Sequence, residues 1–187
     1  MSEVMLFPLS SVVLPEGKMR LRIFEPRYKR LVSQAMQGEG TFGVCLFDRD
    51  NRGQELSNVG TLAKIIDFEL LEDGLLGISI TGLSKFKIQS VRVEYDGLRL
   101  ARIETLPSWS AEEIEANDMR ITTELVRVYQ QFPDLGELYQ QRFFDDASWV
   151  SQRWLELLPV TNQQFDELTL QKNCHAALSF IKKSLES

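Results

Sequence analysis

Residues 59–82 read VGTLAKIIDFELLEDGLLGISITG, and this stretch contains two strands and the turn that joins them. The first strand, Val59–Leu70, is long and rich in β-branched residues, which favour extended backbone. In the second, apolar Leu76, Ile78 and Ile80 alternate with small residues, as on a strand with one buried face. Glu72-Asp73-Gly74 lies between the strands and is typical of a tight hairpin turn. The stretch therefore predicts an antiparallel hairpin.

The strand pattern continues on both sides of this hairpin. Upstream, Phe42–Phe47 is a short apolar strand. Downstream, the apolar positions change parity at Gln89-Ser90, which predicts a bulge or tight bend. Asp96-Gly97 then turns the chain into a last strand, Leu98–Leu106. Several antiparallel strands with short turns favour a barrel or a curled sheet.

Helical spacing dominates elsewhere. Within the β-rich half, Pro26 begins a predicted helix that ends at Gly38. After Pro107-Ser108 the apolar residues follow helical periods, so we expect an α+β protein with a β-rich domain over residues 1–107 and an α-helical domain over residues 108–187. The helical half contains two predicted capping boxes, Ser110/Glu113 and Thr161/Gln164. Its helices are predicted to end before Pro133 and before Pro159. Within it, Trp154 is predicted to be buried.

Charge and cysteine content narrow the function classes. The chain has 187 residues and a net charge of −6; residues 1–107 carry 14 basic and 14 acidic side chains, so residues 108–187 carry the whole excess. Without a basic excess, nucleic acid is a disfavoured partner. No apolar run is long enough to span a membrane, and the N-terminus lacks a signal-peptide pattern. We therefore expect a cytoplasmic protein, with Cys45 and Cys174 as free buried thiols.

The sequence contains motifs that resemble catalytic or ligand-binding sites, but each lacks the residues or the structural context that such a site needs. Residues 38–43 match G-x-G-x-x-G, but a helix precedes them and a strand follows, the reverse of a dinucleotide site. Residues 48–53 resemble the start of a calcium loop, yet Arg52 and Val59 occupy two ligand positions. No Walker phosphate loop is present, and nothing marks a Ser–Lys dyad. His175, the only histidine, lies off the apolar stripe that contains Cys174, so we expect a surface role and no metal or catalytic site.

The N-terminal region resembles one known family. The runs that carry the resemblance to the Lon protease N-terminal (substrate-binding) domain family are Leu6-Phe7-Pro8-Leu9, Val12-Val13-Leu14-Pro15, Leu21-Arg22-Ile23-Phe24-Glu25-Pro26-Arg27-Tyr28, Phe42-Gly43-Val44, Val59-Gly60-Thr61, Ile80-Thr81-Gly82 and Leu157-Leu158-Pro159. The resemblance extends over nearly the whole chain. It implies a PUA-like antiparallel β-barrel with one inserted helix, followed by a C-terminal α-helical bundle.

The same resemblance implies a function. In Lon this region helps to recognise unfolded substrates, while the ATPase and peptidase domains lie beyond it. We therefore expect a non-catalytic module without a cofactor that binds unfolded polypeptide or a protein partner, as an adaptor or holdase. The alternatives are a PUA-like RNA-binding domain and an unrecognised hydrolase.

The family motif also suggests a binding surface. Phe24, Glu25, Arg27 and Tyr28 are the candidate peptide-binding residues at the border of a groove. A structural role for the same residues is the alternative: Glu25 would cap the helix that Pro26 begins, while Arg27 and Tyr28 would hold that helix against the barrel.

Overall fold

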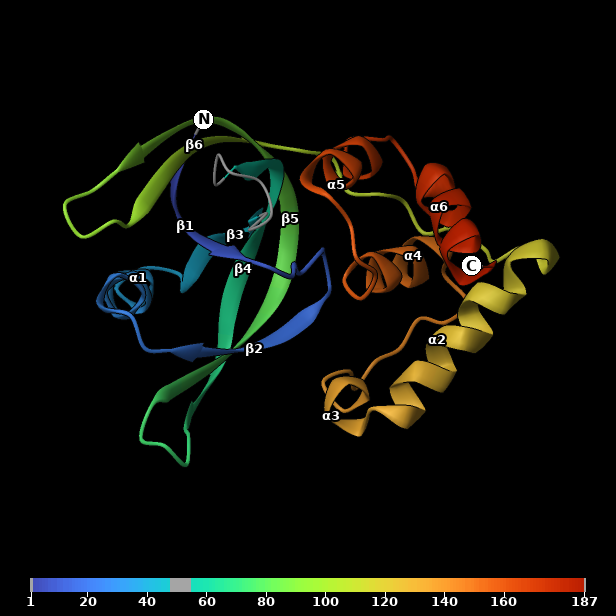
Figure 1. Cartoon of the computed structure of the whole chain (residues 1–187), viewed down its shortest axis with the longest axis horizontal. Coiled ribbons are helices and arrows are strands. Elements are labelled where there is room, and N and C mark those ends of the chain that lie inside the picture. Colours follow the sequence, from blue (N-terminus) through green and yellow to red (C-terminus); the bar gives the residue numbers. More distant parts are fainter. Residues whose placement is uncertain (1, 48–54, 187) are drawn as a thin grey trace. The chain divides into compact units, whose positions relative to one another are not determined.

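The structure is a computed structural model that describes residues 2–47 and 55–186. It divides into two compact units, residues 1–107 and residues 108–187 (Figure 1). The run at 48–53 that resembles a calcium loop lies outside the described residues. In the described part of the chain, no helix has the length and the apolar character needed to cross a bilayer.

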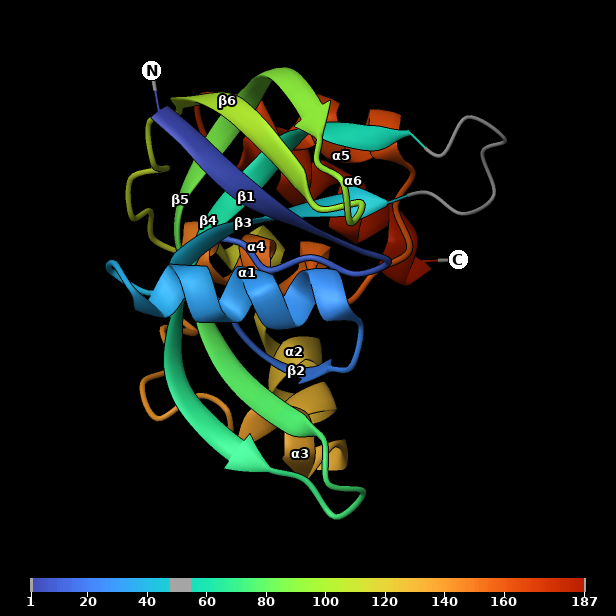
Figure 2. The ribbon, with the colours of Figure 1, turned by 90° about the vertical axis from the view of Figure 1, so that its left-hand side faces the viewer.

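The first unit is built on a six-stranded mixed sheet with one helix beside it (Figure 2). In sheet order the strands are β2, β5, β4, β3, β1 and β6. Their bounds in chain order, with the helix, are β1 Ser2–Leu9, β2 Lys18–Ile23, α1 Pro26–Met36, β3 Thr41–Phe47, β4 Leu56–Leu70, β5 Leu76–Val93 and β6 Arg99–Thr105.

The sheet is not wholly antiparallel, which corrects the expectation from the sequence. β1 runs parallel to β3, with Leu6 opposite Gly43 and Leu9 opposite Leu46. A parallel pair needs a long crossover between its strands, and here β2 and α1 supply it. β6 pairs antiparallel with both β1 and β5, so β1 has a neighbour on each side.

The local features read from the sequence are confirmed. β4 and β5 form the predicted hairpin, with Gly74 in its turn at φ 82°. The pairing of β5 with β6 shifts register between Ile88 and Ser90, where the apolar parity changes. The turn between these strands places Gly97 at φ 90°, a left-handed conformation that glycine adopts without steric cost. Helix α1 begins at Pro26 as predicted.

Two glycines of the sheet are explained by one aromatic ring. A Cβ atom at Gly60 would lie 2.5 Å from the Phe86 ring, and one at Gly43 would lie 2.8 Å from it. Phe86 is buried and packs with Leu6, Cys45 and neighbouring apolar residues. The second core cluster of the unit is formed by α1, which buries Tyr28, Leu31, Val32 and Ala35 against the sheet.

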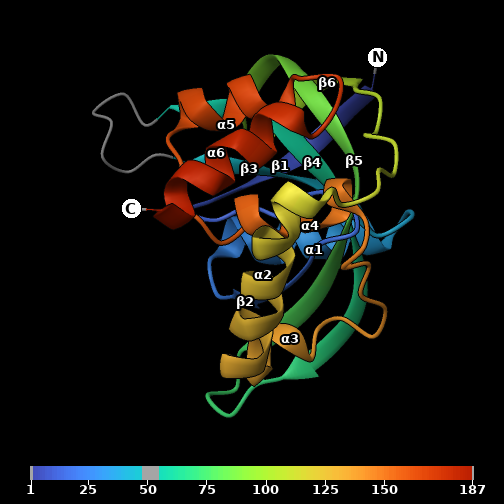
Figure 3. The ribbon, with the colours of Figure 1, turned by 90° about the vertical axis from the view of Figure 1, so that its right-hand side faces the viewer.

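The second unit is helical (Figure 3). Its elements are a 3-10 turn, Ala116–Asp118, followed by α2 Met119–Gln131, α3 Pro133–Gly136, α4 Ala147–Leu155, α5 Asn162–Thr169 and α6 His175–Glu186. The Thr161/Gln164 capping box is present at the start of α5, and α2 ends before Pro133, both as predicted.

The other predicted capping box is wrong. Glu113 forms an isolated β-bridge with Asp146 instead of starting a helix, and α2 begins only at Met119. The Asp146 carboxylate accepts a hydrogen bond from the backbone amide of Glu112 at 3.1 Å, and the Ala147 amide donates to the Glu112 carbonyl at 2.7 Å. These long-range bonds hold the segment extended, so the local capping preference is overridden.

The core of the helical unit is aromatic. Trp149 has ring contacts with Tyr139, Phe143 and Phe144, all near edge-on at centroid distances of 5.6–6.1 Å. Trp154 is buried, as predicted, and its indole N–H donates to the Ile121 carbonyl at 2.9 Å. These contacts tie α4 to α2 and to the segment before α4.

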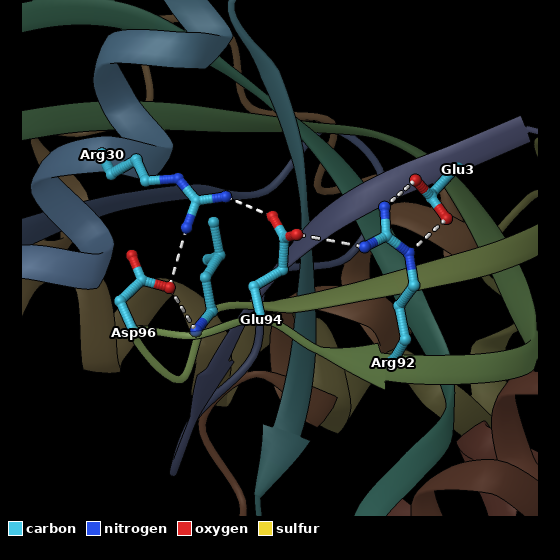
Figure 4. Close-up of polar contacts among 6 residues, drawn as sticks. Glu3, Arg30, Arg92, Glu94 and Asp96 are labelled. Atoms are coloured by element: carbon cyan, nitrogen blue, oxygen red, sulfur yellow. Dashed lines mark hydrogen bonds and ion pairs between the residues drawn. The ribbon is translucent and has the colours of Figure 1, made fainter.

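A chain of ion pairs fastens α1 to the sheet (Figure 4). Arg92 donates two hydrogen bonds to the Glu3 carboxylate, at 2.8 and 3.1 Å, and one to the Glu94 carboxylate, at 3.1 Å. Arg30 on α1 pairs with the same Glu94 and, at 2.8 Å, with Asp96. The network therefore links β1, α1 and the end of β5 with the turn that follows it.

We expect Arg30→Met to destabilise residues 1–107 at pH 7 and to have a shrinking effect as the pH falls below about 4. The hydrogen bond from Arg30 holds the pKa of Asp96 below its ordinary value of 3.8. A carboxylate with a lowered pKa stabilises the fold above its unfolded pKa and loses that contribution as the pH falls through the folded value. At low pH the wild type therefore loses the stabilisation from the Arg30–Asp96 ion pair, which the variant lacks at every pH.

The measurement is urea unfolding at pH values from about 3 to 7, with circular dichroism as the probe of unfolding. The matched control is Arg127→Met, which removes an exposed pair with Glu124 on α2 and should change stability little at any pH. An Arg30→Met effect of constant size across the range would contradict the prediction.

Candidate functional site

A pocket of the first unit lies where β1, β2 and α1 meet. It has a volume of about 560 Å³. Its walls come from the end of β1, from β2, from the first turn of α1, and from the adjoining ends of β3 and β6. The lining residues are Phe7, Pro8, Leu9, Ser10, Arg20, Leu21, Arg22, Phe24, Glu25, Arg27, Tyr28, Phe47 and Arg99.

All four residues that the sequence nominates line this pocket. Phe24, which lies between β2 and α1, is 60% exposed. Tyr28 is only 9% exposed and stacks on Phe7 with ring centroids 4.0 Å apart. Phe24 therefore offers a free aromatic face to a ligand, whereas Tyr28 mainly forms the pocket floor.

Glu25 occupies the N-cap position of α1, but its side chain makes no cap hydrogen bond, so the expected side-chain cap is wrong. The Glu25 backbone carbonyl accepts from the amides of Tyr28 and Lys29, both at 3.0 Å, and its carboxylate pairs with Arg27 at 3.1 Å. Arg27 also donates to the Gly97 carbonyl at 3.4 Å, so it joins α1 to the turn before β6. Arg27 and Tyr28 therefore both line the pocket and hold α1 in place.

The pocket wall is strongly cationic, a property that the sequence analysis missed. Four arginines line it, at positions 20, 22, 27 and 99, against one carboxylate. Arg22 pairs with Asp73 and Arg27 with Glu25, whereas no carboxylate in the described residues pairs with Arg20 or Arg99. The signal for Arg20 and Arg22 is present in the sequence, since positions two apart on a strand share a face. Arg99 could not have been found, because only the tertiary fold brings it to the pocket.

The chemistry of this lining suits binding better than catalysis. Guanidinium groups present a fixed fork of donors to carboxylate or phosphate. Burial raises the pKa of the Tyr28 hydroxyl, so this group stays protonated and can donate. The lining offers one aliphatic hydroxyl, Ser10, and no histidine that could act as its base.

In the second unit, the predicted burial of Cys174 and the predicted exposure of His175 are both confirmed. Cys174 is buried and His175 is exposed. Burial raises the pKa of the Cys174 thiol to about 11, and the neighbouring Glu112 carboxylate adds to the effect. A protonated thiol is a poor nucleophile, so the pair does not support the hydrolase alternative.

Known proteins share both the sequence pattern and the fold. A crystal structure of a Lon N-terminal domain protein from Xanthomonas campestris is 30% identical, covers 98% of each chain, and superimposes with a TM-score of 0.75. Chicken cereblon is 26% identical over 75% of this chain, and the Lon protease of Cytophaga hutchinsonii is 27% identical over 72%. The chain spans only 34% and 16%, respectively, of these two proteins.

The pocket-lining run from β2 into α1, nearly all of the mixed sheet, and helices α2 to α5 fall within one continuous family match, whereas α6 lies beyond its end. A family model of the ATP-dependent protease La (LON) substrate-binding domain covers residues 3–174. The chain therefore belongs to the LON substrate-binding domain family.

Proposed function

We propose that this chain recognises polypeptide substrates through the pocket of residues 1–107 and that it does so without catalysis. The observation that carries the proposal is the exposed Phe24 in the lining of a pocket of about 560 Å³, in a member of a substrate-binding family. Exposed aromatic side chains are the usual anchors of protein–protein contacts. An adaptor or holdase role is the form that this recognition would take in the cell.

The scaffold for recognition is, in this proposal, a PUA-like barrel followed by a helical bundle. The double pairing of β6, with β1 and with β5, supports the barrel. Contacts among α2, α4 and α6 support the bundle.

The arginines of the pocket refine the expected ligand. An unfolded polypeptide that offers both an apolar side chain and a carboxylate would match Phe24 together with Arg20 and Arg99. Since such a site samples many sequences, we expect weak binding, with a Kd of about 1 μM or higher.

RNA binding is the second candidate, and the same arginines favour it. Guanidinium groups beside an exposed aromatic ring can hold a phosphate and stack a base. Against it stand the lack of any basic excess in residues 1–107 and the net charge of −6. Phosphate-driven binding would weaken steeply between low and moderate salt.

The test is fluorescence anisotropy of the full chain with two labelled ligands, casein as an unfolded polypeptide and a single-stranded RNA, each over a salt series. We expect casein to bind, and we expect Phe24→Ala to weaken that binding about tenfold, the loss of about 1.4 kcal/mol typical of an anchor residue.

The matched control is Phe132→Ala in the second unit. Phe132 is exposed to nearly the same extent, 58% against 60% for Phe24, but it does not line the pocket. Equal losses in the two variants would mean that apolar surface in general, not the pocket, binds casein. Tight, salt-sensitive RNA binding without casein binding would put RNA recognition in first place.

A further inference from the structure

Three different metal-binding donors converge in the second unit, where the sequence suggested no site. The Glu112 Oε1 atom lies 2.7 Å from the His175 Nε2 atom, and Glu112 Oε2 lies 3.5 Å from the Cys174 Sγ atom. All three donor groups lie within 4.8 Å of one another. In the sequence, Cys174 and His175 stand out only as an adjacent pair, whose side chains would diverge on a helix. Glu112 lies more than 60 residues away, and only the fold brings it close to both.

Both chain segments that carry these donors are held in place. Glu112 is fixed through its backbone by Asp146, at 3.1 Å, and by the Ala147 amide, at 2.7 Å. On the other segment, the Asn173 side chain accepts from the His175 amide at 3.1 Å, and the Cys174 carbonyl accepts from Leu178 at 2.9 Å. These backbone hydrogen bonds fix the two segments from which the three donor side chains extend.

The surroundings favour a cation. Glu112 and His175 line a cavity of about 230 Å³ with three further carboxylates, those of Glu113, Glu115 and Asp118. Its only lysine, Lys182, is paired with Asp118. The start of α6 contributes about half a positive charge, which opposes a metal ion. Four carboxylates outweigh that half charge.

We propose that Glu112, Cys174 and His175 bind a Zn²⁺ ion. Thiolate, imidazole and carboxylate together form a ligand set that zinc prefers, at about 2.3 Å from sulfur and about 2.0–2.2 Å from nitrogen and oxygen. Those bond lengths place tetrahedral ligands roughly 3.5 Å apart, so the present separations, all within 4.8 Å, need to change by at most about 1.3 Å. Three protein ligands leave the fourth position to water or to a partner's side chain. On binding, the Cys174 thiol releases its proton to solvent and the thiolate sulfur bonds to the ion.

Cobalt is the probe, because Co²⁺ substitutes for Zn²⁺ and reports its ligands by colour. Tag-free, reduced full-length chain is titrated with Co²⁺ and then with Zn²⁺. We expect a thiolate-to-cobalt charge-transfer band in the near ultraviolet and tetrahedral bands in the visible, with saturation at one equivalent and loss of both on adding Zn²⁺. Absence of the charge-transfer band would overturn the proposal.

The chain supplies its own control, because its only other cysteine lies in the other unit. Cys174→Ser should abolish the charge-transfer band, whereas Cys45→Ser should leave it unchanged. Glu112→Gln and His175→Gln should each weaken Co²⁺ binding about tenfold or more. A band that survives in Cys174→Ser would also refute the site.

A measurement on the unmutated chain removes any dependence on how the variants fold. Alkylation of each cysteine is followed by mass spectrometry, with Zn²⁺ or with a chelator present. Zn²⁺ should slow the alkylation of Cys174 and leave that of Cys45 unchanged. Equal rates at Cys174 under the two conditions would show that the thiol is not a ligand.

Discussion

Replacing Trp149 by alanine should lower the free energy of unfolding of residues 108–187 by about 3–5 kcal/mol, the range for truncating a large buried aromatic. The indole is 1% exposed and contacts three aromatic rings within the same unit. Tyr139 and Phe144 are themselves held by ring contacts with Tyr129, so we expect these neighbours to fill the space only in part. The cavity therefore persists, and its cost adds to the lost burial.

Tryptophan fluorescence during urea unfolding measures this effect for the second unit alone. All three tryptophans, at positions 109, 149 and 154, lie in residues 108–187, and two remain in the variant. Phe132→Ala, at an exposed aromatic of the same unit, should change the unfolding free energy by less than about 0.5 kcal/mol. A Trp149→Ala loss below about 1 kcal/mol would mean that the aromatic core is not packed as described.

The largest effect in the first unit should come from Gly82→Ala, with a loss of about 3 kcal/mol, the upper end for overpacking. A Cβ atom there would lie 2.1 Å from the Leu14 carbonyl oxygen. Gly82 also donates to the Gly17 carbonyl and accepts from the Glu16 amide, both at 2.9 Å. Relief of the clash would push residues 14–17 away from β5 and break these two hydrogen bonds.

The buried Cys45 thiol reports the opening of residues 1–107, which lack tryptophan. Burial raises its pKa to about 12, so the folded unit should react slowly with an alkylating reagent. In urea, Gly82→Ala should expose Cys45 to alkylation at a lower denaturant concentration than the wild type does. Gly38→Ala is the control, since a Cβ atom there meets nothing closer than 3.8 Å. A Gly82→Ala midpoint equal to that of Gly38→Ala would contradict the predicted clash.

Local patterns predicted the local structure of this chain well. The parity change at Gln89-Ser90 located a register shift, and Thr161/Gln164 located a capping box. Where the prediction was wrong, a distant segment decided the outcome. Glu113 resembles a capping residue in the sequence, but Asp146 holds it in a bridge. The parallel pairing of β1 with β3 likewise depends on a contact between segments far apart in sequence.

The same division applies to the pocket. Phe24, Glu25, Arg27 and Tyr28 could be nominated because they form one continuous run that carries a family pattern. Arg99 enters the pocket from β6, and the ring of Phe7 reaches Tyr28 from β1. Arg99 is not marked by its neighbours in the sequence, so its place in the cationic wall emerges only from the folded chain, as does the contact of Phe7 with Tyr28.

The position of β1 between β3 and β6 has a consequence for the protein during its synthesis. Ser2 pairs with Ile103, so β1 pairs with the strand of its unit that is synthesised last. At about 5–20 residues per second, the nascent chain grows for roughly 5–20 s before β6 exists. Until then one edge of β1 has no partner strand, and an unpaired apolar edge invites aggregation. The sheet of residues 1–107 is therefore completed only after β6 has been synthesised, and a chaperone that shields β1 in the nascent chain should raise the yield of folded protein.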